Sequence, residues 1–227
     1  SSTAEGVGIS SSAMSGMTLR LAVACLALTA TALHAAEPDL DALLARLARP
    51  APETTSFVEV RYSSLLETPI VVSGRLEHRQ DGSLVRRVDT PYREVTELRG
   101  ENVTVEREGS KPRHFSLNRA PELRGMLASF AALLQGDRQM LDRYFVVALQ
   151  GTDARWGITL SPRDAKLKRR LSRITVNGRD DRPRCFTLEE PDADASLMAI
   201  GVERPDDLPQ PLDQTALAAW CAGETVP

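Results

Sequence analysis

Strict alternation of apolar and polar residues dominates positions 155 to 200 of the chain. Four alternating segments follow one another there, at residues 156–162, 171–178, 185–188 and 196–200, and each ends at Pro, Gly, Asp or a charged turn. Such alternation is typical of strands with one buried and one solvated face. Four strands at short intervals predict an antiparallel meander, whose inner face something apolar must cover.

Two other segments change to the period of a helix. Residues 38–49 carry leucines at the i, i+3, i+4 and i+7 spacing of one apolar face, and prolines follow them. Residues 121–135 carry a similar stripe of Leu, Met and Phe that begins at a proline and ends at Gly136. We therefore expect one helix before the strands and one in the middle of the chain.

The remaining alternating segments complete the prediction. Strands are expected at residues 56–63, 70–79, 83–89, 92–98, 102–108, 111–117 and 145–150, with a short helical turn at 138–144. The layout is a helix, a first group of strands, a central helix and a second group of strands. This order predicts an α+β fold, in which a large antiparallel sheet carries a few helices against one face.

The beginning of the chain has the pattern of a secretory signal peptide. Residues 17–36 combine a short basic start, an apolar stretch and a site of small residues, and the stretch is shorter than the roughly 20 residues of a membrane-spanning helix. Residues 1–16 are expected to be an overlong gene start or a remnant of cloning. We expect a cleavable signal peptide that exports the protein to the periplasm, a folded domain at 37–204 and a C-terminal tail at 205–227.

Composition and motifs exclude several functional classes. The formal net charge of −3 lacks the basic excess typical of nucleic-acid binding, and aromatic residues make up only 4% of the chain. His78 and His114 each lie in a strand among charged residues, outside any metal-ligand spacing. No nucleophile elbow or glycine-rich phosphate loop is present. The sequence predicts a protein that is not an enzyme, with no cofactor, metal or nucleic-acid partner.

Two cysteines, Cys185 and Cys221, remain after removal of the signal peptide. In an oxidising compartment an even number of cysteines usually indicates a disulfide. This bond would tie the C-terminal tail to a strand of the sheet. The alternative, a pair of metal ligands, has no nearby histidine to complete it.

The order and spacing of several motifs resemble the LolA-like periplasmic lipoprotein carriers over most of the chain. The matching segments are Phe57-Val-Glu59, Ser73-Gly74-Arg75-Leu76, Tyr92-Arg-Glu94, Leu160-Ser-Pro162 and Ile174-Thr-Val176-Asn-Gly178. The resemblance implies that residues 37–204 form an incompletely closed β-barrel, whose apolar concave face is covered by helices acting as a lid. The aromatic residues that such carriers have in the third strand and the next hairpin are largely replaced by aliphatic ones here.

The same resemblance implies a function. We expect a monomeric carrier that takes a lipoprotein or lipid-like cargo from an inner-membrane export complex and passes it to an outer-membrane acceptor. Each exposed CH₂ of an acyl chain costs roughly 0.8 kcal/mol in water, so the cargo needs an apolar container. The alternative is a non-catalytic sensor or interaction module of the cell envelope that uses the same half-barrel.

The first strand offers two linings for such a container, because its alternating faces differ. One face carries Val58, Val60 and Tyr62, the other Phe57, Glu59 and Arg61. We select the first face because it is the more apolar. The predicted cavity and lid residues are Val58, Val60, Tyr62, Val72, Leu84, Met126, Leu127, Phe130, Ile158, Leu160, Ile174 and Val176. Arg61 and Arg75 are the two candidates for the family's lid-latching arginine.

Overall fold

The alternating segments form one antiparallel sheet in a computed structural model that describes residues 39–117, 132–133 and 135–224. The predicted signal peptide and the central-helix residues Met126, Leu127 and Phe130 lie outside these described residues. The strands are β1 (Glu53–Tyr62), β2 (Ile70–His78), β3 (Leu84–Thr90), β4 (Glu94–Arg99), β5 (Asn102–Arg107), β6 (Arg113–Ser116), β7 (Phe145–Thr152), β8 (Arg155–Pro162), β9 (Arg173–Arg179), β10 (Arg182–Glu189) and β11 (Ala195–Ile200).

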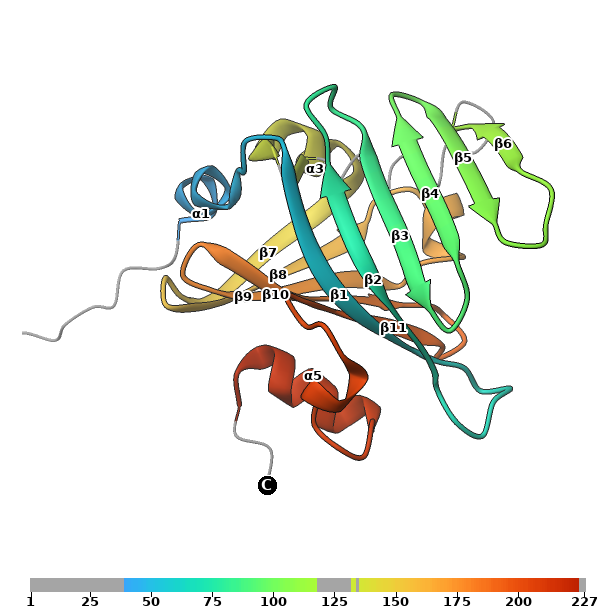
Figure 1. The fold of residues 1–227 in the computed structure, drawn as a ribbon. Helices are drawn as coiled ribbons and strands as arrows, with labels where there is room; N and C mark the ends of the chain where they lie inside the picture. The colour runs from blue at the N-terminus through green and yellow to red at the C-terminus, as the bar shows by residue number, and fades with distance from the viewer. Residues whose placement is uncertain (1–38, 118–131, 134, 225–227) are drawn as a thin grey trace, which may run out of the picture. The chain divides into compact units, whose positions relative to one another are not determined.

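The order of the strands explains how two meanders make one sheet. Strands β1 to β6 follow one another outwards, β7 lies at the opposite edge, and β8 to β11 return until β11 pairs with β1. Every neighbouring pair is antiparallel, and the edge strands β6 and β7 are not paired with each other. The sheet bends so that its two ends turn towards each other without closing (Figure 1). This confirms the predicted α+β fold with an open, curved antiparallel sheet.

The helices of the described residues are short and capped by aspartates. They are α1 (Leu40–Leu47), α3 (Arg138–Tyr144), α4 (Ala165–Lys168), the 3₁₀ turn η2 (Pro205–Asp207) and α5 (Gln214–Ala222). Asp39, Asp164 and Asp213 accept hydrogen bonds from the backbone N–H groups that begin α1, α4 and α5. Within the described part of the chain, none of the helices is long and apolar enough to cross a membrane.

Different helices cover the two faces of the sheet. We call the face that carries α1 and α3 the inner face, and the face that carries α5 the outer face (Figure 1). The four leucines of α1 pack on the inner face of β8 and β9, against residues such as Ile158 and Ile174. On the outer face, Leu217 of α5 packs with Val58 and Val60 of β1. The sheet therefore has two apolar faces and needs both covers.

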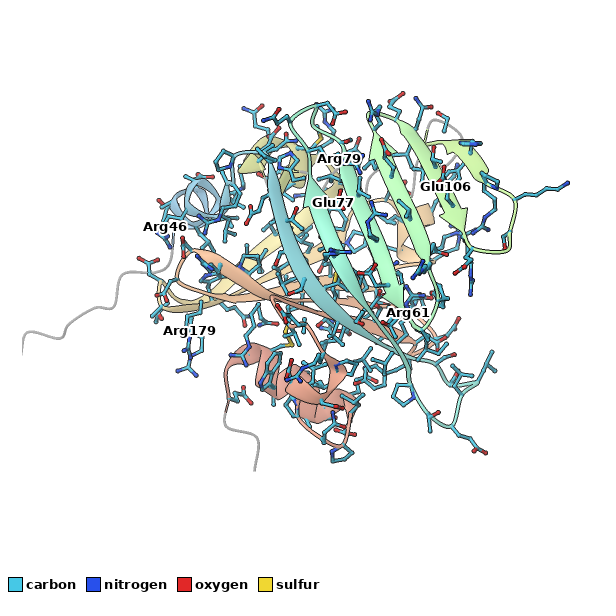
Figure 2. The ribbon with its side chains drawn as sticks, in the orientation of Figure 1. Arg46, Arg61, Glu77, Arg79, Glu106 and Arg179 are labelled. Atoms are coloured by element: carbon cyan, nitrogen blue, oxygen red, sulfur yellow. A yellow bond between two sulfur atoms is a disulfide. The ribbon has the colours of Figure 1, made fainter. Side chains whose placement is uncertain are left out.

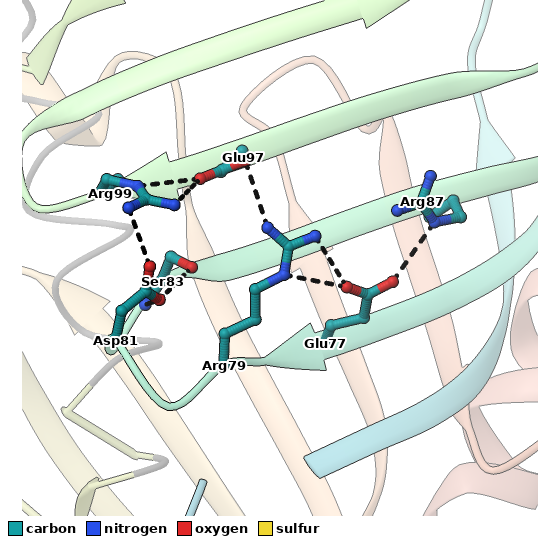
Figure 3. A network of polar contacts seen from close by, with 7 residues as sticks. All are labelled: Glu77, Arg79, Asp81, Ser83, Arg87, Glu97 and Arg99. Carbon is teal, nitrogen blue, oxygen red and sulfur yellow. Dashed lines mark hydrogen bonds and ion pairs between the residues drawn. The ribbon is translucent and has the colours of Figure 1, made fainter. Parts of the chain in front are cut away.

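The outer face of β2 to β4 is instead covered by a network of paired charges (Figure 3). Glu77 accepts hydrogen bonds from Arg79 at 3.1 Å and from Arg87 at 3.3 Å. Arg99 donates to Glu97 at 2.8 Å and pairs with Asp81 at 2.9 Å. Because each arginine of the network has an acidic partner, this part of the surface has no large excess of charge.

The C-terminal segment is part of the fold. Cys185 of β10 and Cys221 of α5 form a disulfide across a sequence separation of 36, which confirms the predicted bond. Leu208 and Leu217 are buried in the same cluster as the two cysteines. Residues 205–224 thus form a cover for the outer face, and the disulfide holds that cover on β10.

We predict that replacing both cysteines, Cys185→Ser with Cys221→Ser, lowers the free energy of unfolding by about 4 kcal/mol, because the unfolded chain regains the entropy of an open loop. Guanidinium denaturation of the two proteins measures the difference. The unsubstituted protein under reducing conditions is the control and should match the variant. Equal stability of the variant and the oxidised protein would contradict the prediction.

Candidate functional site

A cavity of about 1490 Å³ lies along the inner face, beside the part of the sheet that α1 covers, and its lining extends past the end of β11 to Val202 and to Trp220 of α5. Its apolar lining comes from both halves of the sheet and follows the strand register, since Leu84 pairs with Leu98 and Phe186 pairs with Met198. On the inner face of the strands, the apolar side chains of this lining include Leu76, Leu84, Leu98, Val103, Phe186, Leu188, Met198 and Ile200.

Helix α1 explains why the inner face is filled on one side and hollow on the other. Its leucines fill the space over β8 and β9, where Ile158, Leu160 and their neighbours are fully buried. Two ion pairs attach the end of α1 to hairpin turns: Arg46 to Asp153 at 2.9 Å and Arg49 to Asp181 at 2.6 Å. Leu47, in the last turn of α1, borders the cavity. The helix therefore forms one wall of the cavity.

The loop between β1 and β2 forms an apolar rim at one end of the cavity. Leu65, Leu66 and Ile70 all border the cavity and are 90%, 45% and 44% exposed. Neighbouring apolar side chains that remain in water at the opening of a hollow are a common mark of a binding site. An apolar molecule that enters here would pass from an apolar rim to an apolar lining.

A buried cluster of charges lies in the floor of the cavity on β1. Glu59 is only 5% exposed, and its strand neighbours on the inner face are Val72 and Met198. Arg61 donates to both carboxylate oxygens of Glu59, from Nε at 2.8 Å and from Nη2 at 3.1 Å. Ser196 donates its hydroxyl to the same carboxylate at 2.5 Å.

Arg86 completes this cluster from β3. Its guanidinium reaches the Glu59 carboxylate and passes over the ring of Phe57, with Cζ 5.0 Å from the ring centroid. A second nitrogen of Arg86 lies 3.8 Å from Glu94 on β4. We call Glu59, Arg61, Arg86 and Ser196 the Glu59 cluster.

Burial opposes ionisation of Glu59, but the hydrogen bond from Arg61, the charges of Arg86 and Arg61 and the Ser196 hydroxyl outweigh it and lower the pKa of Glu59. Glu59 in turn raises the pKa of Arg61, against the effect of burial. The cluster is therefore ionised at neutral pH. It places a fixed charged group in a mixed, largely apolar lining, and Arg61, whose side chain is 40% exposed, is the most exposed of its three charged members.

The structure corrects the predicted lining of the first strand. Val58 and Val60 lie on the outer face under α5, and the inner face carries Phe57, Glu59 and Arg61. Apolarity misled the prediction because α5 also needs an apolar partner. The disulfide indicates the correct orientation of the sheet. Cys185 of β10 faces α5, so the next residue, Phe186, and its neighbours across the strands face inwards.

The other predicted lining residues in the described part of the chain divide into two groups. Tyr62 and Leu84 border the cavity, although Tyr62 also donates its hydroxyl to the Leu212 carbonyl at 3.2 Å in the C-terminal segment. Burial and the charge of Asp213 raise the pKa of Tyr62 to about 12. The second group is buried in the core and does not line the cavity: Val72, Ile158, Leu160, Ile174 and Val176.

The two latch candidates lie on opposite faces. Arg61 is in the cavity and bound to Glu59, whereas Arg75 is on the outer face and pairs with Asp89 at 3.3 Å. Neither residue forms an ion pair with a helix of the described part of the chain. Across residues 39–117, 132–133 and 135–224, no three His, Cys, Asp or Glu side chains are grouped as a metal site would need.

Comparison with known families gives one match that covers most of the chain. A family model described as outer membrane lipoprotein carrier protein LolA-like matches residues 31–202. This is more than half of the 227 residues, and the chain therefore belongs to the LolA-like family. None of the curated proteins compared with the chain matches it significantly.

Several solved structures are matched at low sequence identity. The LolA superfamily protein NE2245 from Nitrosomonas europaea is 10% identical, with 75% of this chain and 96% of that chain covered and a TM-score of 0.41. A DUF1329 family protein from Desulfovibrio piger is 14% identical, with coverages of 79% and 96% and a TM-score of 0.40. The MucA/MucB complex from Pseudomonas aeruginosa is matched at 17% identity, with coverages of 75% and 60% and a TM-score of 0.31.

We predict that Glu59→Gln lowers the free energy of unfolding by about 3 kcal/mol at neutral pH, because it leaves two arginines in a largely buried site without their counter-charge. The folded pKa of Glu59 is lower than its unfolded value of about 4.3. Its contribution is therefore complete above that value and is lost as the pH falls through the folded pKa.

Denaturation of the two proteins at a series of pH values tests both statements. The difference in stability between them should shrink as the pH falls below about 4. Glu189→Gln is the matched control, since Glu189 pairs with Arg173 at 2.7 Å in a solvent-exposed position and screening makes such pairs weak. A loss of stability as large in the control, or a difference independent of pH, would contradict the prediction.

Proposed function

We propose that this LolA-like protein binds the acyl chains of a lipoprotein, or a related lipid-like molecule, in the inner-face cavity and carries it through the periplasm towards the outer membrane. The observation that carries the proposal is the combination of a large apolar cavity with the exposed rim of Leu65, Leu66 and Ile70. Burial of a chain there would recover roughly 0.8 kcal/mol for each CH₂ removed from water.

The size of the cavity favours a lipid over a small metabolite. Its 1490 Å³ exceeds the range of about 300–1,000 Å³ that is usual for small-molecule sites. The lining offers aliphatic side chains such as Leu76, Leu98 and Leu188, which suit a flexible hydrocarbon better than a flat aromatic ligand. This supports a cargo with more than one acyl chain.

The Glu59 cluster supports a carrier that also releases its cargo. A charged cluster in the floor cannot be covered by a collapsing wall without removing the partly exposed Arg61 from water, which costs free energy. The cavity therefore resists closure when it is empty. The same polar spot limits the apolar area that a bound chain can contact, and so limits its affinity.

The role needs a donor and an acceptor. We infer that an inner-membrane export complex loads the protein and that an acceptor at the outer membrane unloads it, with no chemical change in the cargo. Neither step requires a cofactor or a catalytic group. Transfer of a labelled lipoprotein from inner-membrane vesicles to outer-membrane vesicles, with and without the protein, measures this role directly.

Native mass spectrometry with lipid extraction, on protein purified gently from the envelope of its own host, tests the cargo. An acylated molecule bound at a fixed stoichiometry is the expected result. An empty protein that also fails to take up a fluorescent fatty acid would overturn the carrier proposal. The sensor or interaction module would then be the better account of the half-barrel.

We predict that Leu98→Asp reduces uptake of a fluorescent fatty acid at least about tenfold, since a carboxylate in the apolar lining must be desolvated by the bound chain. Val95→Asp is the matched control: Val95 lies on the same strand but on the outer face, where it pairs with Arg87. Circular dichroism verifies that both variants are folded. Equal uptake by the two folded variants would place the ligand outside the inner-face cavity.

A further inference from the structure

The end of the cavity opposite the apolar rim is basic. Arg179, Arg182 and Arg184 border the cavity around the turn between β9 and β10. Figure 2 shows Arg179 and Arg61 far apart, with Arg179 at the lower left and Arg61 at the lower right, near the C-terminal end of β1. The cavity thus runs from an apolar rim to a group of three arginines, which we call the arginine end.

A β-bulge sets the position of Arg184. The register of β10 against β9 shifts between Pro183 and Cys185, so Arg184 is the extra residue at the shift. Its guanidinium lies 3.8 Å above the ring of Trp220 in the last turn of α5. The next residue in each element forms the disulfide between Cys185 and Cys221, which holds strand and helix together at this point. The arginine therefore rests on a fixed aromatic surface.

The turn itself is also held in place. Trp156 of β8 donates its indole N–H to the carbonyl of Asp180 at 3.0 Å. The same ring lies against Gly178, where a Cβ atom would come within 2.1 Å of the indole. A side chain at position 178 would displace the ring, so glycine is required there. The turn that carries the three arginines is thus anchored to β8.

The arginine end has more positive than negative charge available to a ligand. Within the described residues, neither Arg179 nor Arg184 has a carboxylate partner within 4.0 Å, and Arg182 is 4.0 Å from Asp181. Asp181 is already bound by Arg49 at 2.6 Å. Asp180 is the other carboxylate of the turn. Burial and the positive charge of Arg179 lower the pKa of Arg184.

Other arginines of the protein are arranged differently. The three arginines in the network of Figure 3 each have an acidic partner, and Arg75 on the same face pairs with Asp89. In the Glu59 cluster, Arg61 and Arg86 share a buried carboxylate. The arginine end borders the same cavity as the Glu59 cluster but has no buried carboxylate among its described partners, so its guanidinium groups remain available for an added anion.

We propose that Arg179, Arg182 and Arg184 form a subsite for the anionic, phosphate-class headgroup of the amphiphile whose acyl chains occupy the cavity. This inference rests on the proposed lipid-binding function and adds the chemical class of the cargo's head. Guanidinium groups bind phosphate oxygens through paired, charge-assisted hydrogen bonds, and three of them at one end of an apolar cavity match a molecule with one charged end.

The test compares two amphiphiles that share a chain and differ in the head. Dodecyl phosphate and dodecyl maltoside, below their critical micelle concentrations, displace the neutral fluorescent probe N-phenyl-1-naphthylamine from the purified protein. The unsubstituted protein should bind dodecyl phosphate about tenfold more tightly than dodecyl maltoside, and added salt should reduce the preference.

Two sets of variants locate the preference. Arg179→Gln with Arg182→Gln changes two exposed side chains, and Arg184→Gln is then added. Each set should lose affinity for dodecyl phosphate and keep its affinity for dodecyl maltoside. Arg113→Gln with Arg170→Gln removes two exposed arginines elsewhere and is the matched control. Its preference should be unchanged.

The outcomes separate this inference from the proposed function. If the probe and dodecyl maltoside bind but dodecyl phosphate has no advantage, or if the arginine variants keep the advantage, the headgroup subsite is overturned and the lipid-binding function stands. If neither amphiphile nor the probe binds, the proposed function fails as well. Inorganic phosphate should not displace the probe and should not remove the preference at equal concentration. If it removes the preference, the site takes free phosphate and not a lipid headgroup.

Discussion

Strand β1 must be buried on both of its faces, and the arrangement of the rest of the protein depends on this. Phe57, Val58, Glu59 and Val60 follow one another in the chain, and all four are buried. Alternate residues of a strand point to opposite sides, so two separate covers are needed. On the outer side α5 supplies the cover and the disulfide holds it there. On the inner side, α1 covers only part of the sheet, and the cavity occupies the remaining space.

The inner face combines packing and hollow space in a way that follows from α1. Its leucines fill the space over β8 and β9, and ion pairs from Arg46 and Arg49 hold its end against two hairpin turns. The strands beyond reach of α1 keep their apolar side chains around the cavity. The charged groups of the protein fall into three sets. In the Glu59 cluster two arginines share one buried carboxylate, in the outer network each arginine has an acidic partner, and the arginine end keeps an excess of positive charge.

The hydrophobic periodicity of the sequence was sufficient to predict the strands and much of the fold. Alternation placed nearly every strand within a few residues of its observed bounds, as for residues 102–108 against β5 (Asn102–Arg107). The pairing of Cys185 with Cys221 could also be predicted, because the number of cysteines and the compartment left few alternatives. Leu84, which the alternation put on an apolar face, borders the cavity.

The sequence by itself determined which residues alternate, that helices lie near residues 38–49 and 138–144, and that the sheet is large and antiparallel, since these follow from local patterns of the chain. Only the tertiary structure decided which face of β1 looks into the cavity. That choice depends on α5, which packs on Val58 and Val60 from more than 150 residues away. The same holds for the Glu59 cluster: its members come from β1, β3 and β11, and no local pattern joins them. Only folding brings these charges close enough to outweigh the cost of burial.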